Sequence, residues 1–291
     1  MAPCRRARWR AVTYQATLRE GFVFEGPGLH TGVHCRVDVR PAPVDAGLFF
    51  VLDGGTVVPA TVEYVVETAR ATVLGKDGVT VSTVEHLLAA LFGMGISNAE
   101  IRVSGPEIPV TDGSAKEFAD AIDRCGIAPQ GAARERYAIG SPTFVRDGDR
   151  AVVCLPSAKF RVKFLADFPA PVGSQYFDAE ITPELFYSDI CSARTFGYLR
   201  EVEDLRKRGL AKGGTLENAI VFAPEGPLQP LRWPNEVVRH KVLDLLGDLA
   251  LLGAWPQFEI IAIKSGHKLH CIAVGELRKT LTTTLPSAKV R

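Results

Sequence analysis

The sequence predicts an α+β fold made of two similar domains. Segments with strand patterns and segments with helix patterns occur in groups along the 291 residues, whereas a parallel βαβ sheet would make them alternate strictly. A stretch with Gly, Pro and Gln near 125–140 indicates a surface connection between two halves. We therefore expect a first domain at 12–128 and a second domain at 138–283.

The first half begins with short segments rich in β-branched and aromatic residues, which are typical of strands. An apolar run that contains Glu85 and His86 then predicts a buried helix. Asp112-Gly113 signals a turn, and Ser114 is a suitable N-cap for the helix that follows. The predicted elements are strands at 21–26, 34–41, 47–52 and 57–65, a helix at 82–94, a strand at 99–103 and a helix at 115–125.

The second half repeats the order of strands, a buried helix and a further strand, with one long addition. Apolar residues around His240 and Asp248 predict a second buried helix. The stretch 168–215 mixes Pro, Gly and aromatic residues with a charged helix, so we interpret it as an insertion, and long insertions are often functional. The predicted elements are strands at 142–148, 150–156 and 160–168, a helix at 236–252, and strands at 258–264 and 268–277.

The two buried helices share one spacing pattern. His86 and His240 are each followed seven residues later by a glycine (Gly93 and Gly247), then by a loop and a strand. The pattern predicts a duplicated unit in which each half contributes its helix to a shared interface. Both histidines would then face the cleft between the halves, where ligand sites often form.

The composition argues against several classes of function. The formal net charge is +1, so bulk electrostatics indicate no nucleic-acid partner. No apolar run approaches the roughly 18 to 20 residues of a membrane-spanning helix. The six cysteines lack CxxC spacing, which indicates reduced, mostly buried thiols and not a cysteine zinc site.

The first nineteen residues contain five arginines and no acidic residue, a pattern with a faint similarity to an organelle transit segment. They lack the serine content and the length of such a segment, and there is no apolar secretory region. We expect a cytoplasmic protein, with a mitochondrial or other organelle location as the alternative.

His240 and Asp244 stand four residues apart, and Asp248 stands four further on. Residues at i and i+4 share a helix face, so a His and an Asp at this spacing can bind one ion. A buried His–Asp hydrogen-bonded pair is the alternative, but His86 offers a third ligand and Asp248 a surplus carboxylate. Two His and one carboxylate leave a position open for water, which is the catalytic arrangement. The pattern therefore predicts one Zn²⁺, with Fe²⁺ as the alternative ion.

Three other ionisable residues are candidates with two interpretations each. Glu85 either accepts a proton from water beside the ion or is an ordinary carboxylate favoured by the helix macrodipole. His267, in a tight Ser-Gly-His turn, is either catalytic or a surface residue. His30, between glycines in a loop, either contacts substrate or only forms a turn. We expect His270 to be structural, inside a strand.

Seven motifs occur in an order that identifies a family. They are GPGLHTG, STVEHLLAAL, IPVTDGSAKEF, ICSARTFGYL, LAKGGTLENAIVF, VRHKVLDLLGDLALLG and KSGHKLH. Together they resemble the zinc-dependent UDP-3-O-acyl-N-acetylglucosamine deacetylases, the committed step of lipid A biosynthesis, over residues 13–275. The chain departs from the family pattern in its basic N-terminal extension and around ETARATVLG, where the family often has Met and Cys.

The resemblance implies a β-α-α-β sandwich, in which two sheets enclose the helices, and a βαβ insert that forms a passage for the acyl chain. It implies that the acylated UDP-N-acetylglucosamine is deacetylated by hydrolysis. The roles it implies are metal ligation for His86, His240 and Asp244, catalysis for Glu85, His267, Asp248 and Thr195, and substrate contact for Phe196, Gly197, Lys241 and His30.

Three functions remain open at this point. The first is the active deacetylase, expected as a monomer without a fused dehydratase domain. The second is a metal-free protein that binds sugar nucleotides on the same fold, against which the intact ligand and base positions argue. The third is a zinc hydrolase that acts on another N-acyl substrate. Whether Glu85 or His267 protonates the leaving amine is also open.

Overall fold

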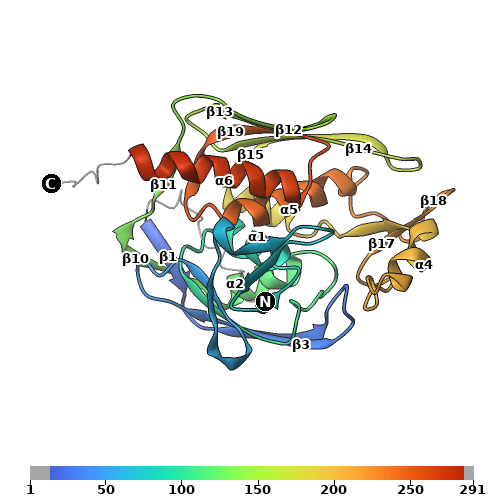
Figure 1. Cartoon of the computed structure of the whole chain (residues 1–291), viewed down its shortest axis with the longest axis horizontal. Helices are drawn as coiled ribbons and strands as arrows, with labels where there is room; N and C mark the ends of the chain where they lie inside the picture. The colour runs from blue at the N-terminus through green and yellow to red at the C-terminus, as the bar shows by residue number, and fades with distance from the viewer. Residues whose placement is uncertain (1–13, 285–291) are drawn as a thin grey trace, which may run out of the picture.

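Two sheets enclose a layer of helices in the structure of this protein (Figure 1). The structure is a computed structural model that describes residues 14–284, with side chains for residues 14–280. One sheet and its helices come from the first half of the chain, and the other sheet and its helices come from the second half. The predicted α+β fold class, a β-α-α-β sandwich, is confirmed.

The first sheet has five strands in the order β2-β3-β9-β4-β5. Strands β4 and β9 are parallel, and the other neighbours are antiparallel. Side chains alternate between buried and accessible along β3 and β9, as expected for a sheet with one face on the core. The elements are β2 (Phe22–Pro27), β3 (His34–Pro41), β4 (Leu48–Val51), β5 (Val57–Pro59), β9 (Ala99–Ser104), α1 (Glu85–Gly93) and α2 (Lys116–Cys125).

The second sheet repeats this topology, with the strand order β12-β13-β19-β14-β15. Here β14 and β19 are parallel, and the other neighbours along the path are antiparallel. The shared order and directions support a duplicated unit, while the bounds 12–128 and 138–283 stay predictions. The elements are β12 (Thr143–Asp147), β13 (Arg150–Pro156), β14 (Arg161–Phe168), β15 (Gly173–Glu180), β19 (Trp255–Ile263), α5 (Glu236–Ala250) and α6 (His267–Thr284).

Smaller elements connect and extend the two layers. The segment expected as a surface connection contains two strands, one pairing with β1 and one lying parallel to β19. The remaining elements of the first half and the connection are β1 (Tyr14–Leu18), the 3-10 turns Asp53–Gly55 and Val62–Tyr64, β6 (Val65–Glu67), β7 (Val73–Lys76), β8 (Val79–Val81), β10 (Ile127–Ala133) and β11 (Arg136–Ala138).

The second half carries a βαβ insert in which β16 and β17 are parallel and α4 lies between them in the chain. The predicted range 168–215 differs from this unit at both ends. It includes β15, which is an edge strand of the second sheet, and it stops before β17. The elements are α3 (Pro183–Leu185), the π-helical turn Phe186–Ile190, β16 (Phe196–Tyr198), α4 (Leu199–Lys207), β17 (Ile220–Ala223) and β18 (Gly226–Pro227).

The predicted strand at 268–277 is wrong, because this segment lies in helix α6. Its Ile, Val and Cys content suits a strand, but most of its buried residues follow the helical period at 269, 270, 273, 274 and 277, and Cys271 is buried beside them. Packing against the second sheet selects the helix. The predicted strand at 57–65 is also interrupted, by the turn Val62–Tyr64.

No helix among the described residues is both long and apolar enough to span a membrane. The five cysteines that the structure describes form no disulfide. Cys4 and most of the basic segment behind the organelle alternative lie outside the described residues.

Candidate active site

Helices α1 and α5 cross at close range, and this crossing assembles the site. A Cβ at Gly247 would lie 2.1 Å from the carbonyl oxygen of Glu85, so only glycine permits the approach of the two backbones. Glu85 and His86 begin α1, while His240 and Asp244 lie on successive turns of α5. The crossing therefore places ionisable residues of both halves side by side.

His86, His240 and Asp244 form a cluster with metal-ligand geometry. Oδ1 of Asp244 lies 3.6 Å from Nε2 of His86 and 3.4 Å from Nε2 of His240. Ligand atoms bound tetrahedrally to zinc at 2.0–2.1 Å stand about 3.3 Å apart. All three side chains are buried, and their ligand atoms lie within 4.8 Å of one another. These three residues fit a divalent metal ion.

The protonation states in this cluster also suit a metal. Burial lowers the pKa of His240 to about 4, which keeps its ring neutral. Its Nδ1 lies 3.1 Å from the carbonyl oxygen of Ala193, so Nδ1 carries the proton and Nε2 presents its lone pair to the cluster. Burial alone would raise the pKa of Asp244, but the interactions with His240 and Lys241 outweigh it and hold that pKa well below its usual range.

Glu85 stands beside the cluster with only 3% of its surface exposed. Its Oε2 accepts a hydrogen bond of 3.0 Å from the backbone N–H of Thr72, and its Oε1 lies 3.8 Å from Nε2 of His267. Burial raises the pKa of Glu85, although the charges of His267 and His86 oppose the effect. A carboxylate with a raised pKa and a free oxygen toward a histidine is suited to accept a proton.

His267 is the first residue of α6 and is held by Asp248. Its Nδ1 lies 2.9 Å from Oδ2 of Asp248, which is fully buried. Burial alone would lower the pKa of His267, but the carboxylates of Asp248 and Glu85 outweigh it and raise that pKa to about 9. Burial likewise would raise the pKa of Asp248, but His267 and His270 lower it to about 2. The pair is thus an imidazolium against a carboxylate near neutral pH.

Sequence reasoning missed two residues around Asp248. Nδ1 of His270 lies 2.8 Å from the same Oδ2, and Nε2 of His270 lies 2.9 Å from the hydroxyl of Ser265. The hydroxyl of Thr72 donates to Oδ1 at 2.6 Å. Oδ2 of Asp248 thus lies 2.9 Å from Nδ1 of His267 and 2.8 Å from Nδ1 of His270. These are hydrogen-bond distances, too short for two ligands around one zinc ion. The i, i+3 spacing of His267 and His270 would have been a signal had the helix been recognised; Thr72 offered none.

Two predicted residues, Thr195 and Phe196, come soon after Ala193, whose carbonyl oxygen contacts His240. The ring of Phe196 is 6.2 Å from the ring of His240, in an edge-to-face arrangement. Thr195 follows the segment that contacts His240, and its backbone N–H donates to the carbonyl of Gly113 at 2.7 Å. This bond ties the insert to the first half of the chain. The roles of both residues toward substrate stay predictions.

Lys241 contacts a residue of the cluster, whereas Gly197 has open space around it. Nζ of Lys241 donates to Oδ2 of Asp244 at 2.6 Å, so this cation neutralises the carboxylate on the side away from His86 and His240. An added Cβ at Gly197 would meet no described atom within 4 Å, so packing does not require glycine there. A substrate contact by either residue stays a prediction.

His30 lies in a loop that Glu107 holds in place. The Glu107 carboxylate accepts from the backbone N–H of His30 at 2.9 Å and from the hydroxyl of Thr31 at 2.8 Å. The backbone N–H of Lys212 donates to the His30 carbonyl at 3.1 Å, so the second half docks on this loop. Nδ1 of His30 is buried and has no hydrogen-bond partner among the described residues. Burial lowers the pKa of His30, although the charge of Glu107 opposes the effect.

The chain is similar to known proteins over most of its length. The family model LpxC, UDP-3-O-acyl N-acetylglycosamine deacetylase, matches residues 15–279. A protein of Myxococcus xanthus named UDP-3-O-acyl-N-acetylglucosamine deacetylase is 45% identical over 262 residues, which cover 88% of this chain and 83% of that protein. Proteins with the same name are 42% identical in Nostoc sp. (88% of this chain, 95% of that protein) and in Geobacter sp. (92% and 90%). The chain therefore belongs to the UDP-3-O-acyl-N-acetylglucosamine deacetylase family.

Proposed function

We propose that this protein hydrolyses the N-acetyl group of UDP-3-O-(3-hydroxyacyl)-N-acetylglucosamine, in a zinc-dependent reaction of lipid A biosynthesis. The products are acetate and the free 2-amino sugar nucleotide. The name shared by its relatives supports the substrate. The observation that carries the chemistry is the buried carboxylate of Glu85 beside the cluster of His86, His240 and Asp244.

One zinc ion per chain would be held by His86, His240 and Asp244. Nitrogen ligands from two imidazoles favour zinc over the harder cations, and Fe²⁺ is the alternative at the same geometry. When bound, the ion supplies Lewis-acid polarisation of the acetyl carbonyl and lowers the pKa of a coordinated water. Lys241 balances the second oxygen of Asp244 and leaves Oδ1 for the ion.

Glu85 is the general base in this proposal. Its Oε2 is engaged by Thr72, while Oε1 faces the histidine side of the site. The carboxylate takes a proton from the water as the oxygen of that water attacks the acetyl carbon. Burial raises the pKa of Glu85, which brings it closer to the working pH, where a general base is most efficient.

His267 supplies positive charge where the oxyanion develops. With a pKa of about 9 it is protonated at neutral pH, and Asp248 holds its Nδ1 so that Nε2 points at the site. The imidazolium and the Thr195 hydroxyl would donate hydrogen bonds to the carbonyl oxygen as its charge grows. The amine leaves with a proton from either His267 or Glu85.

The insert supports an acylated substrate. Phe196 lies 5.0 Å from Phe168 and 6.3 Å from Phe222 between ring centroids, so an aromatic cluster begins beside His240. Apolar walls of this kind suit an acyl chain. Lys241 and His30 would contact the polar part of the substrate. A cytoplasmic location and a monomeric state remain expectations.

Turnover of two substrates tests the proposal. Acetate release would be measured with the zinc-loaded protein on the 3-O-acylated UDP-N-acetylglucosamine and on UDP-N-acetylglucosamine without the acyl chain. We expect much faster release from the acylated compound. Equal rates on both would remove the acyl specificity, and no release from either at full zinc occupancy would overturn the deacetylase function.

A further inference from the structure

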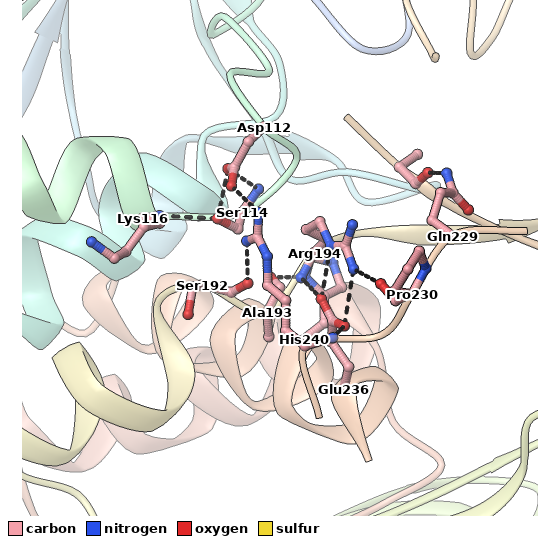
Figure 2. Close-up of polar contacts among 12 residues, drawn as sticks. Asp112, Ser114, Lys116, Ser192, Ala193, Arg194, Gln229, Pro230, Glu236 and His240 are labelled. Carbon is pink, nitrogen blue, oxygen red and sulfur yellow. Dashed lines mark hydrogen bonds and ion pairs between the residues drawn. The ribbon is translucent and has the colours of Figure 1, made fainter. Parts of the chain in front are cut away.

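One peptide unit, between Ala193 and Arg194, bridges two side chains of helix α5 (Figure 2). Its carbonyl oxygen lies 3.1 Å from Nδ1 of His240, and its N–H donates to Oε1 of Glu236 at 3.1 Å. Glu236 and His240 are four residues apart and therefore project from the same helix face. A trans peptide is planar with its N–H and C=O opposed, so whatever fixes the N–H also fixes the direction of the C=O.

The buried carboxylate of Glu236 holds this peptide in one orientation. The side chain is fully buried at the first residue of α5, where the helix dipole favours a negative charge. It accepts from the Arg194 backbone, from Nε of Arg194 at 2.9 Å, from Nη2 of Arg194 at 3.2 Å and from the Arg232 backbone at 2.6 Å. Four donors saturate the lone pairs of a carboxylate, so this group has one stable orientation.

Arg194 binds Glu236 through its side chain as well as through its backbone N–H, and we call this pair of residues the Glu236–Arg194 clamp. Its guanidinium meets Glu236 through two nitrogens, and its Nη2 also donates to the carbonyl of Pro230 at 2.8 Å (Figure 2). A second contact holds the neighbouring peptide: Arg232 donates to the Ser192 carbonyl at 2.6 Å and to Asp112 at 2.8 Å. The segment 192–194 thus has its backbone fixed from both sides.

The consequence reaches the metal cluster through His240. A neutral imidazole has two tautomers, and the acceptor at Nδ1 selects the one whose Nε2 is free to bind a metal. The acceptor here is the Ala193 carbonyl, whose direction depends on the Glu236–Arg194 clamp. No member of the clamp is itself a ligand in the cluster.

We propose that Glu236 and Arg194 are positioning residues that hold the Ala193 carbonyl on Nδ1 of His240, and that they thereby set the tautomer and orientation of this metal ligand. The inference rests on the proposed zinc site for its effect on the ion. Its effect on the tautomer of His240 is independent of any bound metal.

Two variants test the clamp in the full-length protein. E236Q keeps the shape of the side chain but removes its charge. Its amide N–H₂ group would also face N–H groups of Arg194 or Arg232, so hydrogen bonds to that side would be lost. R194K keeps the charge but loses the planar two-nitrogen contact, and it serves if E236Q does not fold. We expect both to bind Zn²⁺ about 10- to 100-fold more weakly than wild type in competition with a chelator, the usual effect of a partner behind a ligand. Excess zinc should restore much of kcat.

The matched control is D189N. Asp189 also pairs with an arginine of α5, Arg239 at 3.2 Å, but among the described residues it forms no hydrogen bond or ion pair with residues 192–194. We expect D189N to keep the zinc affinity of the wild type. A loss equal to that of E236Q would overturn the proposal, because charge near α5 would then be the cause.

Ring ¹⁵N NMR of the metal-free proteins provides a readout that loss of stability alone would not change. His240 should carry its proton on Nδ1 in wild type and D189N, and a mixture of tautomers should appear in E236Q and R194K. An unchanged tautomer together with unchanged zinc affinity in both variants would overturn the proposal. Failure of the wild type to bind zinc would instead contradict the proposed function, and the tautomer measurement would still decide on the clamp.

Discussion

Replacing Asp248 by Asn removes the negative charge that keeps His267 protonated. The pKa of His267 is about 9 in the folded protein against an ordinary value of 6.5, and burial alone would lower it. The carboxylate lies 2.9 Å from Nδ1, and a charge at such a distance changes a pKa by about 1 to 3 units. In D248N we therefore expect the pKa of His267 to fall by about that amount.

The rate follows the protonated fraction of His267, so the loss grows with pH. At pH 8 a histidine of pKa about 9 is about nine-tenths protonated, whereas one of pKa 6.5 is about 3% protonated. A return of this pKa to 6.5 would therefore lower the rate about 30-fold at pH 8 and much less near pH 6. The alkaline limb of kcat/KM should move to lower pH, while the acid limb, which we assign to Glu85, should stay in place.

The assay is the pH dependence of kcat/KM at saturating zinc for wild type, D248N and T72V. T72V removes the 2.6 Å hydrogen bond to Asp248 but leaves its charge, so its alkaline limb should stay near that of wild type. An alkaline limb that does not move in D248N would refute the assignment to His267. A loss of the same size at every pH would indicate that Asp248 acts only on the geometry.

Three further outcomes are expected. H240A should lose most of its zinc by elemental analysis, because the cluster keeps only two ligands, and full occupancy in it would contradict the proposed site. E85A should keep zinc and fold but lose about two to four orders of magnitude in kcat, as expected for a general base; near wild-type turnover would place the base elsewhere. G247A should lower the free energy of unfolding by about 1 to 3 kcal/mol and weaken zinc binding, because its Cβ would lie 2.1 Å from the Glu85 carbonyl oxygen. Thermal melts would measure this loss. The control G275A, also in a helix, adds a Cβ into open space and should be neutral or stabilising in the same measurement.

The local spacing of residues determined much of this site. The i, i+4 separation of His240 and Asp244 places both on one helix face whatever the rest of the fold does. The matching pattern around His86 predicted the second helix and the duplicated unit, and the ordered motifs indicated the family. The predictions of the two buried helices and of the family were confirmed, because they depend on contacts within one helix or on ordered patterns along the chain.

The tertiary structure decided the features that depend on distant segments. Helix α6 forms where a strand was predicted, since packing against a sheet selects between two local preferences of similar strength. Thr72 reaches Asp248 across 176 positions of sequence, and Glu236 reaches the peptide at Arg194 across 42. The raised pKa of His267 also requires Asp248 and Glu85 to be buried beside it, and burial is a property of the assembled layers. Spacing along the chain therefore identified the candidate ligands, while long-range packing set their protonation and orientation.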